Sequence, residues 1–484
     1  MHSRIRVRLS GFILFASNIA SFLFGFIFIV LISRNLSQHD LGVWFYVGSI
    51  ITYFEFFVKV VPYWAVRDFA RGRNIARTAI TISSIISMPL MIIFVGSSLW
   101  ISTYVEANIM VFVVASLLIP AYYVSASISS ILYAKYPHQV GWRVPIIDGL
   151  KIPLALTLLP HGLAGVLSAV VIANFFYILY GLYIVKREFE KKLDYEWLKN
   201  RFKHAWLPIM QSGISYVNAA SDSFLVGTLL SPTQLSLYGV GTTISNAVRS
   251  SSQLVLPFSM KVLAKTTVSK EEVSSMIKFL TIFTMPMLVG GTLISKNLYN
   301  IFGPAYIDGA GILWILLLSA VITSYTSIFS GTISGIEKSD YDLSVSFKKL
   351  LRSRLFTIIL VDYLTTPLLI VSSLILIPTL NITGAAFSRL VSSLLSLVIF
   401  LSLCLQYIDV RKSLASIGKT AIACIPMSAY LLFFTYPRAS TTIINIFAGA
   451  TIYFATLYLI DKESRYLVKG IIRELAEKVL SILE

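Results

Sequence analysis

Long apolar stretches recur along the whole 484-residue chain, and hydropathy delimits fourteen of them. Most are close to the ~20 residues that a helix needs to cross a bilayer. The predicted spans are 10–32, 41–61, 78–101, 109–131, 144–159, 163–185, 206–230, 236–262, 276–295, 310–334, 355–377, 382–405, 418–436 and 441–460. We therefore expect an all-α polytopic membrane protein, because a helix satisfies its backbone hydrogen bonds within the segment.

The composition supports this prediction. Hydrophobic residues make up 56% of the chain and charged residues 13%, about half of the ~25% typical of soluble proteins. A soluble enzyme, a disordered protein and a secreted disulfide scaffold are thereby excluded. The two cysteines, Cys404 and Cys424, lie in apolar runs and provide neither a disulfide framework nor a thiolate metal site.

The net charge of +17 by itself suggests a nucleic-acid partner, but the positions of the charges argue against one. With the N-terminus placed inside, 33 of the 40 Lys and Arg residues fall in inner segments or within three residues of the inner ends of spans, three in outer loops and four deeper within spans. This is the asymmetry of the positive-inside rule. We predict a multi-pass protein of the cytoplasmic membrane with both termini cytoplasmic, and no nucleic-acid binding.

A Lys-rich polar segment divides the spans into two groups of six. The predicted parts are an N-terminal six-helix lobe (1–185), a cytoplasmic basic linker (186–204), a C-terminal six-helix lobe (205–408), spans 13 and 14 (409–460) and a cytoplasmic amphipathic helix (461–484). The last segment carries its apolar residues at helical spacing, which suits a helix lying in the membrane plane or docked on the protein. A solvated tail that packs on neighbouring loops is the alternative.

The two groups of six resemble each other. A shift of 194 residues aligns Leu36, Ser37, Leu41 and Ile50 with Leu230, Ser231, Leu235 and Ile244. The turns beginning at Pro160 and Pro378 occupy matching places between the fifth and sixth spans of each group. Because six is even, the copies share an orientation, and we expect two pseudo-symmetric lobes around a central cavity.

Eight ionisable residues lie within the spans and away from their inner ends, where each unpaired charge costs about 2.5–3.5 kcal/mol on the insertion scale. They are Glu55, Lys59, Asp148, Lys151, Asp222, Arg249, Asp362 and Arg389. Glu55 and Lys59 are four apart, and Asp148 and Lys151 three apart, so each pair can share one helix face. The other four have no local partner and must pair across helices or line an aqueous cavity.

Each set of charges has two interpretations. The cations Lys59, Lys151, Arg249 and Arg389 either lock helices together as ion pairs or form a cationic lining for an anionic head group. The acids Asp222, Asp362, Glu55 and Asp148 are candidates for coupling to H+ or Na+ or for counter-ions.

Several functional classes lack their motifs. The five histidines have no metal-ligand spacing, no Walker A sequence occurs, and no outer loop exceeds about 15 residues, too few for an external catalytic domain. We therefore expect no metal, no cofactor and no enzymatic activity. Two sequons, at Asn35 and Asn381, fall on predicted outer turns, and the sequence leaves their use open.

Four segments carry a family resemblance: 32–42, 222–257, 301–338 and 378–387. They include Arg34 with the Gly42 turn, Asp222 with Gly227, and Gly303-Pro-Ala-Tyr306. In these segments the chain resembles the polysaccharide or O-antigen flippase branch of the multidrug/oligosaccharidyl-lipid/polysaccharide exporter superfamily. It departs from the commoner pattern at Val61–Asp68, which replaces a Gly-rich start.

The resemblance implies fourteen spans in two six-helix lobes plus two C-terminal helices, with alternating access driven by an ion gradient. It also implies a polyprenyl-linked glycan as substrate and a positively charged cavity for its pyrophosphate, which Lys59, Lys151, Arg249 and Arg389 match in kind. The leading hypothesis is a lipid-linked oligosaccharide flippase that works as a monomer among membrane lipids.

Three alternatives remain open from the sequence. A multidrug exporter of the same superfamily would favour an anionic cavity around Glu55, Asp148, Asp222 and Asp362. A membrane-embedded glycan polymerase or ligase is disfavoured by the short outer loops. A non-transporting scaffold would tolerate neutralisation of the membrane charges as long as packing held.

Overall fold

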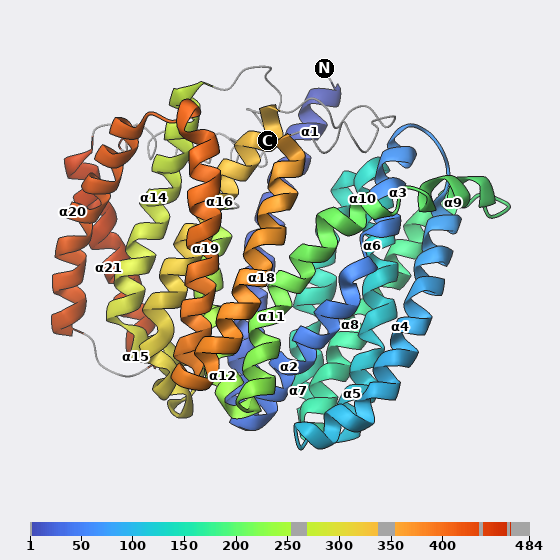
Figure 1. Ribbon diagram of the computed structural model, residues 1–484, viewed down its shortest axis with the longest axis horizontal. Helices are drawn as coiled ribbons and strands as arrows, with labels where there is room; N and C mark the ends of the chain where they lie inside the picture. The colour runs from blue at the N-terminus through green and yellow to red at the C-terminus, as the bar shows by residue number, and fades with distance from the viewer. Residues whose placement is uncertain (1, 253–268, 337–353, 435–438, 462–464, 466–484) are drawn as a thin grey trace, which may run out of the picture.

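The computed structural model describes residues 2–252, 269–336, 354–434, 439–461 and 465. These residues form a bundle of long helices with roughly parallel axes, and no strand occurs among them (Figure 1). The predicted all-α polytopic fold is confirmed. The amphipathic helix predicted for 461–484 lies, apart from Asp461 and Arg465, outside the described residues.

The first half of the chain contains eight α-helices. They are α1 (His2–Asn35), α2 (Gln38–Phe54), α3 (Val60–Ala70), α4 (Ala76–Tyr104), α5 (Ile109–Ser116), α6 (Leu118–Lys135), α7 (Lys151–Leu158) and α8 (Gly162–Val185). A 3-10 turn at Glu55–Phe57 separates α2 from α3, and a 3-10 turn and a π-helical turn (Pro137–Trp142 and Val144–Gly149) precede α7.

The second half begins with the linker and the short helix α9 (Tyr195–Phe202). It continues with α10 (Trp206–Pro208), a π-helical turn (Ile209–Gly213), α11 (Ile214–Leu229), α12 (Pro232–Ser250), α14 (Lys270–Leu293), α15 (Ser295–Phe302), a 3-10 segment (Pro304–Ile312), α16 (Leu313–Ile336), α18 (Arg354–Leu380), α19 (Ile382–Cys404), α20 (Val410–Phe434) and α21 (Ala439–Ile460).

Within the described residues, each of the fourteen predicted spans coincides with a helical segment; part of the eighth (253–262) and the end of the thirteenth (435–436) lie outside those residues. Ten of the described helical stretches are long and apolar enough to cross a membrane, or eleven if α2 and α3, bent by 51°, count as one broken span. The stretch 137–188 is one of the ten but contains two arms, α7 and α8, that pack on each other. The segments α11 and α12 do not pass this test, because they carry many Ser, Thr and Asn residues.

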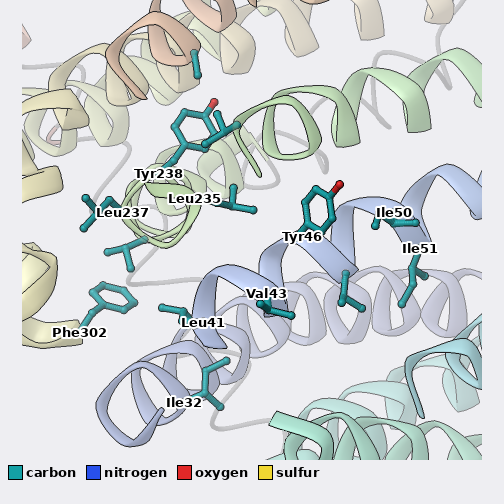
Figure 2. Close-up of a cluster of buried hydrophobic side chains, with 14 of the residues drawn as sticks. Ile32, Leu41, Val43, Tyr46, Ile50, Ile51, Leu235, Leu237, Tyr238 and Phe302 are labelled. Carbon is teal, nitrogen blue, oxygen red and sulfur yellow. The ribbon is translucent and has the colours of Figure 1, made fainter. Parts of the chain in front are cut away.

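The helices fall into two side-by-side groups (Figure 1). Helices α4, α6, α7 and α8 pack together at one edge, and α14, α20 and α21 pack together at the other. Between the groups, α2 packs on α11 and α12, and α1 packs on α12 and α15. A large buried cluster bridges this boundary: Ile32, Leu41 and Tyr46 of the first half meet Leu235, Tyr238 and Phe302 of the second (Figure 2).

The local structure of the two halves supports the predicted repeat. Ser37 and Ser231, which are 194 residues apart, both cap a helix, accepting hydrogen bonds from the backbone N–H of Asp40 and Gln234. Such caps satisfy N–H groups that have no partner in the first turn. Helices α2 and α12 therefore begin in the same way at matching positions.

The second aligned turn also recurs. Gly162 before α8 and Asn381 before α19 both have positive φ, with φ/ψ of 62°/−148° and 53°/−139°. Three residues later, a Cβ at Gly165 or Gly384 would lie only 2.0 or 2.1 Å from a carbonyl oxygen of the preceding helix. The close approach requires glycine at these two positions and gives α7–α8 and α18–α19 the same tight hairpin.

Candidate functional site

A buried ion pair joins α11 to α19. Arg389 contacts Oδ2 of Asp222 through Nη2 and through Nε, the latter at 2.5 Å, and Tyr238 of α12 donates its hydroxyl to the same oxygen at 2.6 Å. The backbone N–H of Ser223 donates to Oδ1. The side chains of Arg389 and Asp222 are 16% and 1% exposed. Asp222 is therefore a fully satisfied counter-ion that holds three helices together.

Arg249 of α12 lies next to this pair and interacts electrostatically with both Asp222 and Arg389. Its Nε is buried and has no hydrogen-bond partner among the described residues. This part of the site therefore holds two guanidinium groups and one carboxylate, with the charge of Arg249 uncompensated within the described part of the chain.

The pair predicted between Asp148 and Lys151 is present. Lys151 Nζ lies 2.7 Å from Asp148 Oδ1, and Ser21 of α1 donates to Oδ2 at 2.5 Å. The ammonium group also lies 5.2 Å from the centre of the Phe28 ring. The pair lies at the junction of the π-helical turn and α7 and fastens this junction to α1.

The shared helix face expected for Glu55 and Lys59 is wrong, because the helix breaks between them. Helix α2 ends at Phe54 and α3 begins at Val60. Lys59 is exposed and still interacts electrostatically with Glu55, but the two form no ion pair within 4 Å in the part of the chain described. Glu55 instead lines a cavity of about 330 Å³.

This cavity lies where α2 of the first half faces α11 of the second. Its walls are Trp44, Phe45, Val47, Gly48, Ser49, Ile51, Thr52, Glu55, Leu118, Tyr122, Leu167, Ala219 and Ser223. One wall residue, Ser223, directly follows Asp222, so the cavity adjoins the buried pair. Glu55 is the charged residue of the lining.

The last of the eight, Asp362 of α18, accepts a hydrogen bond from Ser215 of α11 at 3.3 Å and has no ion-pair partner within 4 Å among the residues described. One turn further along the two helices, Asn218 donates to Thr366 at 3.0 Å. Polar side chains thus form hydrogen bonds between α11 and α18 in the turns of α11 that precede Asp222.

Sequence reasoning missed two cations. Arg143 was assigned to an inner loop, and its side chain is exposed, but it interacts electrostatically with Glu55 and with the half-buried Tyr122. Pro145 and Pro153 are the signal that could have found it, because they interrupt the fifth span directly after Arg143, where the structure has a π-helical turn before α7. The second cation is Arg34.

Arg34 belongs to a seal between the halves at the end of the molecule opposite the N-terminus (Figure 1). It donates from Nε to Ile301 O at 2.7 Å and from Nη2 to Asn300 O at 3.2 Å, in the last turn of α15. A cation suits these carbonyls, which lack helical partners. Further bonds run from Ser33 to Phe302 O and from Gln38 to Ala305 O. The two halves are therefore closed against each other at this end.

Residues 31–307, more than half of the chain, match the family described as "Polysaccharide biosynthesis protein". The chain belongs to this polysaccharide biosynthesis protein family. No curated protein sequence matches the chain. The resemblance drawn from the sequence to polysaccharide flippases is confirmed by this family and by the structural comparisons.

Among solved structures, one described as "Lipid II flippase MurJ, inward closed conformation" aligns with a TM-score of 0.71 at 15% identity, covering 94% of this chain and 100% of that one. An inward-facing multidrug resistance MATE family transporter of the MOP superfamily aligns at 0.59 and 14% identity, covering 80% and 94%. A MATE protein in complex with MaD3S aligns at 0.55 and 14% identity, covering 83% and 96%. This polysaccharide biosynthesis protein therefore shares the multi-pass fold of these proteins.

Proposed function

We propose that the protein is a flippase of the cytoplasmic membrane that moves a polyprenyl-(pyro)phosphate-linked oligosaccharide from the cytoplasmic to the outer leaflet. The family description and the fold shared with a lipid II flippase support this function. The orientation comes from the distribution of Lys and Arg, which puts the sealed end on the outer side. We also propose that the monomer is the working unit.

The uncompensated charge of Arg249 is the observation that carries the proposal. A buried guanidinium nitrogen without a partner in the described residues is costly unless an anion binds there in the transport cycle. The planar fork of arginine suits the oxygens of a phosphate or pyrophosphate, which it can bind bidentately.

The four predicted substrate-binding cations then have different roles. Arg389 and Lys151 are neutralised by Asp222 and Asp148, so we assign them to holding the helices. Arg249 and Lys59 have no such carboxylate within 4 Å among the described residues, and we assign them, together with Arg143, to the head group. None of these cations belongs to the lining of the 330 Å³ cavity, whose charged residue is Glu55, so the cationic site that we propose is distinct from that lining, with Arg143 added to it.

Transport requires the seal formed by Ser33, Arg34 and Gln38 to open while the opposite end closes, which we attribute to rocking of one half against the other. Glu55 and Asp362 are our candidates for coupling to H+ or Na+, because neither has an ion-pair partner within 4 Å among the described residues. Asp222 and Asp148 are assigned as counter-ions.

The test is mass spectrometry of lipid-linked oligosaccharides in cells depleted of this protein, with leaflet sidedness probed by an impermeant reagent. We expect the completed glycolipid to accumulate on the cytoplasmic side. Re-expressed Arg249→Ala should fail to restore transport, and Arg249→Lys should restore part of it, because the charge survives while the fork is lost. The control Arg411→Ala removes an exposed cation from the start of α20 and should restore transport fully. Unchanged sidedness on depletion, or full rescue by Arg249→Ala, would contradict the proposal.

The alternative is a cation-coupled multidrug exporter, which one observation favours: Glu55 is the charged group of the cavity lining. An anionic cavity around all four acids is disfavoured, because Asp148 and Asp222 are already paired with cations. Efflux of a cationic dye that is lost in Glu55→Gln and kept in Arg249→Ala would support the exporter.

A further inference from the structure

The linker between the halves, residues 186–204, is not a free basic segment, because its acidic side chains bind the N-terminal helices. Glu188 accepts bonds from Lys135 Nζ at 2.5 Å and Tyr136 Oη at 2.6 Å. Glu190 accepts bonds from the backbone N–H groups of Arg77 and Thr78, at 3.0 and 2.6 Å. Glu190 thus satisfies N–H groups in the first turn of α4, where a carboxylate also complements the helix dipole.

Helix α9 and its cap are bound to the N-terminal helices in the same way. Asp194 caps this helix through the Trp197 N–H at 2.8 Å and accepts two bonds from Arg73, the shorter at 2.6 Å. Arg201 binds Asp68 of α3 bidentately, at 2.8 and 2.6 Å, and the indole of Trp197 donates to Asp68 at 2.7 Å. Trp197 is 1% exposed. The linker is therefore docked on the N-terminal lobe, at the end of the molecule where the N-terminus lies (Figure 1).

Docking of the linker places most of its carboxylates against the lobe and leaves most of its cations exposed. Three of its four carboxylates, Glu188, Glu190 and Asp194, bind the lobe, and of its seven cations only Arg201 does so through its side chain. The six remaining cations are exposed, and Glu196 is the one exposed carboxylate: the cations are Lys186, Arg187, Lys191, Lys192, Lys199 and Lys203. The outward surface thus carries a net charge of +5, compared with +3 for the linker sequence as a whole.

Exposed aromatic rings lie among these cations. Tyr195 is 71% exposed, Tyr183 67% and Phe202 44%, and the ammonium group of Lys186 lies 4.3 Å above the Tyr183 ring. Helix α8 ends just before the linker and α10 begins just after it, so both ends are held at the level of the membrane surface. Aromatic rings between lysines at this level are typical of segments that bind a bilayer interface.

We propose that this linker face, made of the six exposed cations with Tyr195 and Phe202, binds the head groups of anionic phospholipids in the cytoplasmic leaflet. The lipid phosphates supply the negative charge that the docked carboxylates no longer offer, and the rings insert beside the head groups. Because the linker is fixed to α3, α4 and α6, the bound lipids would anchor the N-terminal lobe, leaving the other half to move. The inference does not depend on the identity of the transported substrate.

The test is a native mass spectrometry titration of the purified full-length protein with phosphatidylglycerol, and separately with phosphatidylcholine. The test variant is Lys191→Gln/Lys192→Gln/Lys199→Gln, and the matched control is Lys270→Gln/Arg411→Gln/Lys412→Gln, which removes the same charge from exposed positions on the same predicted side. The substituted residues of both variants are exposed, so both proteins should keep the wild-type melting temperature. The melting temperatures are measured in parallel.

We expect the test variant to lose affinity for phosphatidylglycerol by on the order of 100-fold, from the loss of three charges near an anionic surface. The control should stay within about threefold of wild type, because its cations lie beside carboxylates: Lys412 is 3.5 Å from Glu271 and 4.0 Å from Asp409. Affinity for phosphatidylcholine should be unchanged in both. Wild-type binding of phosphatidylglycerol by the test variant, or equal losses in test and control, would overturn the proposal. A soluble acidic partner would then be the better occupant of this face.

Discussion

Replacement of Gly42 by Ala is expected to open the seal between the halves. Gly42 lies in the first turn of α2, and a Cβ at this position would be 1.7 Å from the carbonyl oxygen of Pro232 and 2.3 Å from its carbonyl carbon. These are backbone atoms of α12 and cannot turn aside as the end of a side chain can. The two helices must therefore move apart for the variant to exist.

The size of the effect follows from the difference between the two states. Overpacking of this kind costs about 1–3 kcal/mol, and only the closed seal bears this cost. The helix propensity of alanine, worth up to about 1 kcal/mol over glycine, helps the closed and open states equally. The equilibrium should therefore shift toward the open seal by roughly 5- to 150-fold.

Labelling of a cysteine inside the seal measures this shift. Ser33→Cys is suitable because Ser33 is 4% exposed and bonds to Phe302 O across the seal, and the native Cys404 and Cys424 are buried. Cells expressing Ser33→Cys with Gly42→Ala should react faster with an impermeant maleimide than cells with Ser33→Cys alone. Gly48→Ala is the matched control on the same helix, since a Cβ there meets nothing within 4 Å. Equal labelling of the two folded variants would refute the reasoning.

Three further predictions concern the ion pairs and the hairpins. Asp222→Asn leaves Arg389 buried without its carboxylate and should lower the free energy of unfolding by about 3–5 kcal/mol. The double variant Asp222→Asn/Arg389→Gln should melt at a higher temperature than Asp222→Asn alone. A lower melting temperature of the double variant would contradict the ion-pair role. Gly384→Ala brings a Cβ within 2.1 Å of Leu376 O and should cost about 1–3 kcal/mol in thermal unfolding, whereas Gly331→Ala, with nothing within 4 Å, should be neutral or slightly stabilising. Burial opposes ionisation of Asp194 in the linker, but the Trp197 N–H and the Arg73 guanidinium outweigh it and hold its pKa below the usual value. The resulting stabilisation is complete above the unfolded-state pKa of about 3.9 and is lost as the pH falls through the folded-state pKa; melting curves of wild type and Asp194→Asn should therefore differ at pH 7 and converge under acid, and a constant difference would contradict this assignment.

The sequence predicted those features that depend on neighbouring residues. Asp148 and Lys151 are three apart and pair as expected. The 194-residue shift aligned Ser37 with Ser231, and the structure shows that both residues cap a helix. The pair Glu55 and Lys59 shows the limit of this reasoning: spacing of four residues implies proximity only in an unbroken helix, and the helix breaks between them.

The ion pair between Asp222 and Arg389 could not be identified from the sequence, because its members lie 167 residues apart on different helices. Sequence reasoning stated only that each must find a partner or face water. The interaction of Arg143 with Glu55 and the docking of the linker acids were missed for the same reason. Each depends on how a break or a loop turns back onto helices that are distant along the chain.

The amino-acid sequence by itself therefore determined that this chain is a membrane-spanning helical protein with two related groups of spans. Each segment that crosses the hydrocarbon must be apolar over about 20 residues and must satisfy its own backbone hydrogen bonds, so the helical spans can be predicted one segment at a time. Only the tertiary structure decided which charges are neutralised, which face a cavity and which end of the molecule is closed. Electrostatic energy depends on the distance between groups and on their burial, and those distances exist only once the helices of the two halves have packed against each other.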